Sequence, residues 1–108
     1  MAGPDTVAYT ADSAFHALGL EDADEMVVRA DLMRAIARII AERGLTEAQA
    51  GALMVLDHPR VSDLMNGRIT RFSTDRLLRA LRDLGQDIDI RITPAAAGRD
   101  KGSVRVAS

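Results

Sequence analysis

The chain has 108 residues, enough for one small domain with tails, and at this size pairing with a second copy would add useful burial. Its residues are 47% hydrophobic but only 3% aromatic and include no cysteine, which favours packed helices over a β-sandwich and excludes disulfides and thiolate zinc sites. The net charge of −2 is unevenly distributed: residues 1–31 have seven acids and one arginine, a net −6, whereas residues 60–82 have six arginines and two aspartates, a net +4, which predicts a local basic face.

Residues 1–21 are predicted to form an N-terminal leader, with one short turn at 14–18 that ends at Gly19. The leader lacks the basic region and apolar run of a signal peptide. No stretch of the chain approaches the roughly 20 apolar residues that span a bilayer. We therefore expect a cytoplasmic protein with no membrane partner.

A long helix is predicted over 23–43. Asp22 and Glu25 have the spacing of a capping box, and Gly44 ends the segment. Between them, apolar residues recur at helical spacing: Val28, Leu32, Ala35, Ile36, Ile39 and Ile40.

Residues 45–67 are predicted to form two short helices joined by a tight turn. Thr46 and Gln49 form a second capping box, and Ala50, Leu53 and Met54 are expected on the buried side of the helix that follows. Small residues in this helix allow a neighbouring helix to approach closely. The turn is placed at Val55 and Leu56.

The next helix is predicted to begin after the N-cap Asp57 and to end at Gly67. Pro59 falls in the first turn, where its missing N–H is tolerated. Val61 and Leu64 share one side of this helix and polar residues occupy the other, a division suited to a helix that packs on a core and reads base edges.

Ser73 is predicted to cap a fourth helix, with Phe72 and Leu77 spaced as a hydrophobic staple and Gly85 at its end. From residue 87 the period changes to two, which predicts a half-buried strand over 87–93. A single strand cannot satisfy its own backbone, so we expect pairing with its copy in another subunit through a dry side formed by Ile88, Ile90 and Ile92. Residues 94–108 are expected to be a disordered tail.

Other chemistries have little support in the sequence. The two histidines, His16 and His58, have no neighbouring ligands, so we expect no metal site. Asp87 and Asp89 share a strand face, which is more often the wet side of a strand than a catalytic pair. No nucleophile has a base nearby and no glycine-rich phosphate loop occurs, so we expect neither enzymatic activity nor a cofactor.

Three segments carry a resemblance to a known family: 45–50 (LTEAQA), 58–68 (HPRVSDLMNGR) and 71–90 (RFSTDRLLRALRDLGQDIDI). They resemble the Xre-type helix-turn-helix family, which includes the lambda and Cro repressors, and more narrowly its HigA-like antitoxin branch. The leader segment 15–26 (FHALGLEDADEM) is also similar to that branch.

The resemblance implies an all-α, lambda-repressor-like bundle of about five helices, within a domain at 22–93, and a short C-terminal strand paired across a homodimer. It also implies a sequence-specific regulator bound to a palindromic double-stranded DNA operator. Within the antitoxin branch the protein would repress its own operon and neutralise a RelE/HigB-like toxin.

The family's DNA contacts fall on identifiable positions of this chain. Base contacts are expected from the start and outer side of the helix after Asp57: His58, Pro59, Arg60, Ser62 and Asp63. Phosphate contacts are expected from Thr46, Asn66, Arg68, Arg71 and Ser73.

Three positions depart from the family pattern. Val55 stands where the turn usually has glycine, and a positive φ there would be strained. His58 and Glu47 replace glutamines, which leaves the base preference open and places a negative charge near phosphate.

The alternative function is a protein-interaction module that no longer binds DNA and uses the acidic residues 1–31 to dock on a basic partner, such as an RNase toxin. From the charge pattern alone, charged faces exposed to solvent without any partner are an alternative to a basic binding face.

Overall fold

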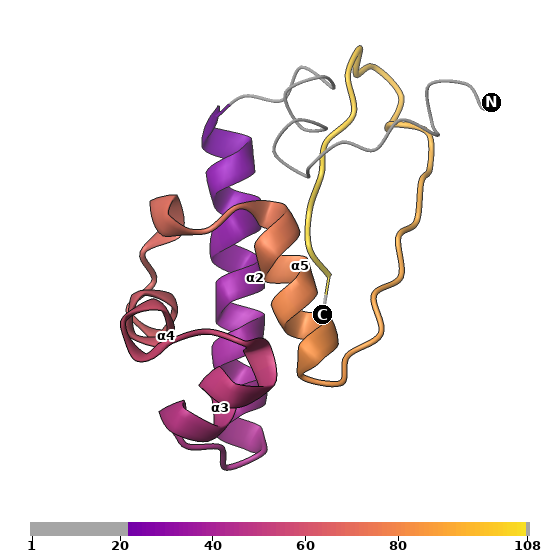
Figure 1. Cartoon of the computed structure of the whole chain (residues 1–108). Coiled ribbons are helices and arrows are strands. Elements are labelled where there is room, and N and C mark those ends of the chain that lie inside the picture. Colours follow the sequence, from indigo (N-terminus) through magenta and orange to yellow (C-terminus); the bar gives the residue numbers. More distant parts are fainter. Residues whose placement is uncertain (1–21, 108) are drawn as a thin grey trace, which may run out of the picture.

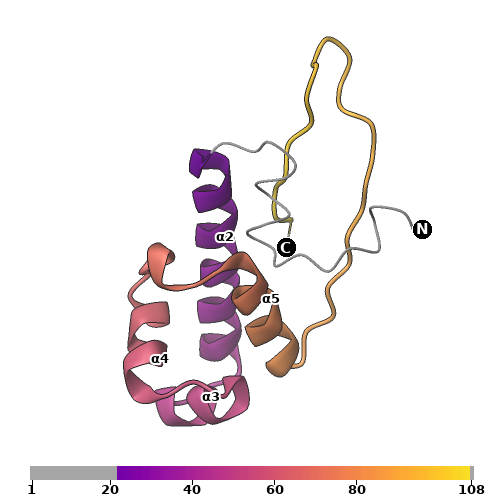
Figure 2. The ribbon, with the colours of Figure 1, turned by 45° about the horizontal axis from the view of Figure 1, so that its top comes forward.

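The computed structural model describes residues 22–107. Within this range the regular structure consists of four α-helices and one 3-10 turn: α2 (Asp22–Glu42), α3 (Glu47–Met54), α4 (His58–Met65), η2 (Ile69–Arg71) and α5 (Thr74–Asp83). The long helix α2 stands in the middle, α4 and α5 flank it, and α3 lies at its C-terminal end (Figure 1). The turned view shows the same arrangement (Figure 2).

The core lies where these helices meet. Ile36 of α2, Met54 of α3 and Leu77 of α5 are completely buried, and Leu64 anchors α4 on the same cluster. The helical spacing predicted for α2 is confirmed, because its apolar residues line this core. Leu53 is a correction: it was expected on the buried side of α3, but its side of the helix faces outward and it is 40% exposed.

The helix ends follow the predicted signals closely. α2 begins at Asp22 and ends at Glu42, within one residue of the predicted bounds at both ends. Glu25 forms an ion pair with Arg29 one turn later, at 2.6 Å, while the Asp22 side of the proposed capping box lies outside the described side chains. After α2, the Arg43 Nη1 donates to the carbonyl oxygen of Leu84 at 2.9 Å, so the ends of α2 and α5 are joined.

The predicted strand at 87–93 is wrong for the single chain. No β-strand occurs among the described residues, and 86–96 runs as extended coil away from the helices (Figure 1). Ile88 packs against the core, whereas Ile90 and Ile92 are 79% and 89% exposed. A period-two pattern cannot form a ladder unless another strand supplies its backbone partners.

The expected count of about five helices also needs correction, because the described residues hold four α-helices and the single turn η2. The turn predicted at 14–18 lies outside the described residues. Residues 96–99 form a turn in which Arg99 N–H donates to the Ala96 oxygen at 3.2 Å and Gly98 has a φ of 88°. The chain then returns and packs Val106 against the core.

Candidate nucleic-acid interface

The capping box predicted at the start of α3 is confirmed. The Gln49 backbone N–H donates to Thr46 Oγ1 at 3.1 Å, and the Thr46 N–H donates to Gln49 Oε1 at 2.9 Å. Thr46 and Glu47 are both exposed. The N-terminus of α3 is therefore fixed in place with its partial positive charge turned toward solvent.

The turn between α3 and α4 is built on a left-handed valine. Val55 has φ 57° and ψ 48°, and the next N–H, that of Leu56, donates to the Gly51 oxygen at 2.9 Å. This closes the helix end in the manner that glycine usually allows. A β-branched side chain in this region strains the backbone.

Replacing Val55 with glycine is expected to stabilise the protein. Its side chain is 82% exposed, so little packing is lost, and relief of about 1–2 kcal/mol of left-handed strain outweighs about 0.5–1 kcal/mol of glycine entropy. Thermal denaturation should show a Tm raised by a few degrees. Ala52→Gly, in an exposed helical position of α3, is the control and should lower the Tm. A lower Tm for Val55→Gly would show that the turn is unstrained.

Gly51 lets α3 and α4 approach. A Cβ at this position would lie 2.9 Å from the Leu56 backbone oxygen and 3.0 Å from Val61 Cγ2. Both distances are too short for a side-chain carbon, and one of them is to the backbone of the turn. The close approach predicted from the small residues of α3 is thus located at Gly51.

α4 is capped, buried on one side and exposed on the other. The Arg60 N–H donates to Asp57 Oδ1 at 3.0 Å, which confirms the predicted N-cap, and Pro59 occupies the first turn. Val61 and Leu64 are buried. One turn apart on the outer side lie His58, Ser62 and Asn66, which we call the outer stripe. His58 and Asn66 are exposed, and Ser62 is half-buried.

The outer stripe is linked internally at its C-terminal end. Asn66 Nδ2 donates to the Ser62 carbonyl oxygen at 2.9 Å and lies 3.3 Å from Ser62 Oγ. Pro59 and Met65 are exposed beside the stripe. This surface presents a hydroxyl, an amide, an imidazole and apolar atoms, which together can hydrogen-bond base edges and contact a thymine methyl group.

Asp63 lies beside the stripe and binds two arginines. Its Oδ1 is 3.4 Å from Arg68 Nε and its Oδ2 is 3.5 Å from Arg71 Nη1. The two guanidinium groups are thus brought together at the C-terminal end of α4, where phosphate contacts were predicted. Sequence reasoning placed Asp63 on the reading side of α4 and missed this role.

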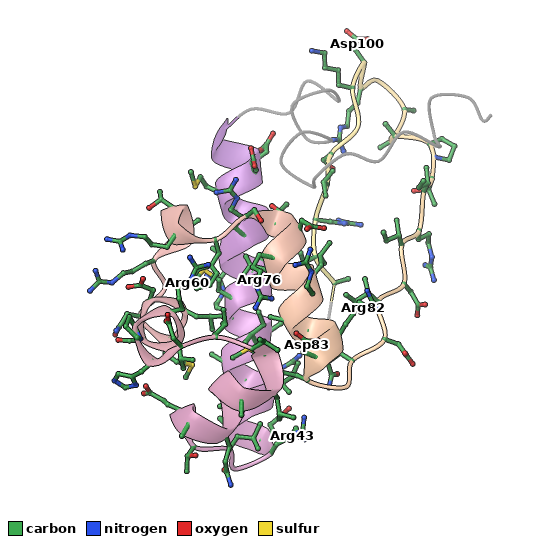
Figure 3. The ribbon with its side chains drawn as sticks, viewed as in Figure 1. Arg43, Arg60, Arg76, Arg82, Asp83 and Asp100 are labelled. Atoms are coloured by element: carbon green, nitrogen blue, oxygen red, sulfur yellow. The ribbon has the colours of Figure 1, made fainter. Side chains whose placement is uncertain are left out.

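Arg60 lies on the flank of α4, where it packs inward. Its guanidinium carbon sits 4.5 Å from the centroid of the Phe72 ring, a cation–π contact (Figure 3). Phe72 itself is buried, as the staple at the start of α5 requires. Nε of Arg60 is buried without a hydrogen-bond partner among the described residues. The side chain therefore braces α4 against the segment that leads into α5.

Arg76 connects α5 to the end of α3. Its Nη2 donates to the Met54 carbonyl oxygen at 2.6 Å, and its own backbone N–H donates to Ser73 Oγ at 3.1 Å, which confirms Ser73 as the N-cap of α5. Arg79 pairs with Asp75 and Arg82 is exposed, but Arg76 is a tertiary link that no local pattern signals.

Two kinds of feature are absent from the described residues. Within the described range, none of the helices combines the length and the apolar character needed to cross a lipid bilayer. Likewise, no three metal-ligating side chains gather at any point between residues 22 and 107.

Comparison with known proteins agrees with this architecture. A family model for a helix-turn-helix domain matches residues 14–93. A solved structure provisionally named an XRE family transcriptional regulator is 31% identical, with a TM-score of 0.77, and the match covers 82% of this chain and 99% of that one. No curated protein matches. The chain therefore belongs to the XRE-type helix-turn-helix family.

Proposed function

We propose that this protein is a sequence-specific DNA-binding transcriptional regulator that inserts α4 into the major groove. The observation that carries the proposal is the outer stripe of α4, held rigidly from the Asp57 cap to the turn at Gly67 and bordered by the exposed arginines 68 and 71. Membership of the XRE-type family supports the same function. A regulator of this kind works in the cytoplasm, beside the DNA.

The proposed DNA-contacting residues fall into two groups, those that contact bases and those that contact phosphates. For base contacts we propose His58, Pro59 and Ser62. Arg60 and Asp63, on the flank of α4, are engaged with Phe72 and with Arg68 and Arg71 respectively. For phosphate contacts we propose Thr46, Asn66, Arg68, Arg71 and Ser73. The exposed N-terminus of α3 supports the assignment of Thr46, because free N–H groups at a helix start attract anions.

We also propose that the protein acts as a homodimer on a palindromic operator. The support is the extended segment 86–96, which leaves Ile90 and Ile92 in solvent and its backbone without a ladder. Pairing this segment with its copy would cover both isoleucines and satisfy the backbone. The two α4 helices would then lie about 34 Å apart, one turn of DNA.

The finer role that we propose is an autorepressing antitoxin, paired with a RelE/HigB-like toxin. It rests on the resemblance of the leader and the helix-turn-helix segments to the HigA-like branch. The acidic character of residues 1–31 supports docking on a basic partner. The same docking would be expected of the alternative function, a protein-interaction module that does not bind DNA. Co-purification with the product of an adjacent small basic gene tests this role. If the gene has no such neighbour, the antitoxin role is contradicted and the protein is an ordinary regulator.

The DNA-binding proposal is tested by selecting bound fragments from the host genome and measuring their affinity by fluorescence anisotropy. The selected fragments should share an inverted repeat, and binding should weaken steeply as NaCl rises. Ser62→Ala should bind the selected duplex about fivefold more weakly, the loss of one hydrogen bond to a base of about 1 kcal/mol. Ser103→Ala, in the C-terminal coil, is the control. Equal affinity for selected and scrambled duplexes would contradict sequence-specific binding.

A further inference from the structure

The arrangement around Asp63 gives this carboxylate a role of its own. Its two oxygens are engaged by different arginines, Oδ1 by Arg68 Nε and Oδ2 by Arg71 Nη1. The Asp63 side chain is only 17% exposed, whereas those of Arg68 and Arg71 are 55% and 58% exposed. The carboxylate therefore lies beneath two guanidinium groups that face solvent.

The backbone holds the three residues in one hydrogen-bonded turn. Gly67 has a φ of 70°, and the Arg68 N–H donates to the Asp63 carbonyl oxygen at 3.0 Å. The Arg71 N–H in turn donates to the Arg68 oxygen at 3.0 Å. Asp63 and Arg68 are thus joined twice, through the backbone and through the side chains. Their proximity is fixed by the fold and does not depend on the ion pair.

This geometry is poorly suited to reading a base. An aspartate reads cytosine by accepting from its amino group, which needs a carboxylate oxygen exposed to the groove, and the Asp63 side chain is only 17% exposed. Both oxygens of Asp63 already face a guanidinium. Each arginine, in contrast, has five N–H donors and uses one of its nitrogens on Asp63, so most of its donors remain for a phosphate.

We propose that Asp63 is a positioning residue that orients Arg68 and Arg71 and cancels part of their charge, and so limits the strength of sequence-independent binding to the DNA backbone. This inference rests on the proposed DNA-binding function. Contacts with the DNA backbone contribute equally to the affinity for operator and for random DNA. When these contacts are weaker, base contacts make up a larger share of the binding free energy, and random DNA competes less well with the operator.

Asp63→Asn should strengthen binding to DNA of any sequence. Losing two long ion pairs whose arginines are exposed costs little, whereas removing a negative charge next to both guanidinium groups strengthens their contacts with phosphates. We expect about threefold to tenfold tighter binding to a random-sequence 30-base-pair duplex at low salt. The salt dependence should steepen by about 0.9 in log–log slope, one further phosphate neutralised. The ratio of operator affinity to random affinity should fall.

Two matched variants separate this effect from a general change of charge or fold. Asp100→Asn removes the same charge at the tip of the C-terminal turn, far from α4 (Figure 3), and should change affinity less than twofold. Asp63→Glu keeps the charge and should keep the salt slope of the parent protein. Circular dichroism melting confirms that each variant is folded at the temperature of the assay.

The outcomes separate this inference from the proposed function. If the parent protein binds no duplex at low salt, both are overturned. If it binds, but Asp63→Asn and Asp100→Asn have the same affinity and slope, the inference alone is overturned. The same holds if Asp63→Asn changes the preference at a single base pair and leaves random binding unchanged, because that is the signature of a base contact.

Discussion

Replacing Gly51 with valine should lower the free energy of unfolding by about 3 kcal/mol, the upper end of the range for overpacked cores. The new Cβ would lie 2.9 Å from the Leu56 carbonyl oxygen, a backbone atom in the turn that joins α3 to α4. The branched methyl groups would add to the clash with Val61. Urea denaturation monitored by circular dichroism measures the loss.

The same substitution should also move α4. Val61 is buried in the core, so the clash is relieved most readily by opening the angle between α3 and α4. Gly51→Val should therefore bind operator DNA at least tenfold more weakly even at temperatures where it is fully folded. Ala52→Val adds the same side chain at the next, exposed position and should cost less than about 1 kcal/mol, its helix propensity alone. Equal stability of the two variants would mean that the helices adjust without strain.

Replacing Arg76 with alanine should destabilise the protein by about 2–3 kcal/mol. The variant loses the 2.6 Å hydrogen bond from the guanidinium to the Met54 carbonyl oxygen, together with the packing of the half-buried side chain. The carbonyl at the end of α3 would lose a charged donor at a point where few waters can replace it. Because this bond ties α5 to the turn, DNA affinity should fall as well. Urea denaturation and anisotropy measure the two effects.

Arg79 provides the matched control, one turn away on the same helix. It pairs with Asp75 at 3.1 Å, but its side chain is 60% exposed, so Arg79→Ala should cost less than about 0.5 kcal/mol. Arg76→Met keeps the apolar stem and should fall between Arg76→Ala and the parent protein. If Arg76→Ala and Arg79→Ala are equally stable, the contact with Met54 contributes nothing.

The helix starts could be predicted because their signals are local. Thr46 and Gln49, Asp57 and Ser73 each lie within three residues of the group they cap, and all three caps are found in the structure. A strained turn at Val55 could be anticipated only from the family resemblance, in which glycine usually occupies this position, and Val55 does have a positive φ of 57°. Belonging to the XRE-type family is confirmed as well.

The contacts that shape the interface could not be predicted in the same way. Arg76 and Met54 are separated by 22 residues, and only the packing of α5 on α3 brings them together. Asp63 and Arg68 are near in sequence, but their pairing depends on the left-handed Gly67, which reverses the chain after α4. A rule that a polar residue on the outer side of a recognition helix reads bases misses the role of Asp63.

The segment 87–93 shows a different limit. Alternation of Asp and Ile predicts a strand, whereas the segment runs as extended coil (Figure 1). Whether an extended segment becomes a strand depends on a partner, which the pattern of one chain does not contain. Ile88 packs on the core, whereas Ile90 and Ile92 are exposed, because the helical core extends only as far as residue 88.

The left-handed valine has a genetic consequence. Every valine codon becomes a glycine codon through a change of its middle base, so relief of the turn at Val55 is one point mutation away. A random library of this gene, screened for survival of a heat step, should therefore recover that change early. Asparagine, which also tolerates this conformation, requires at least two base changes and should be found rarely.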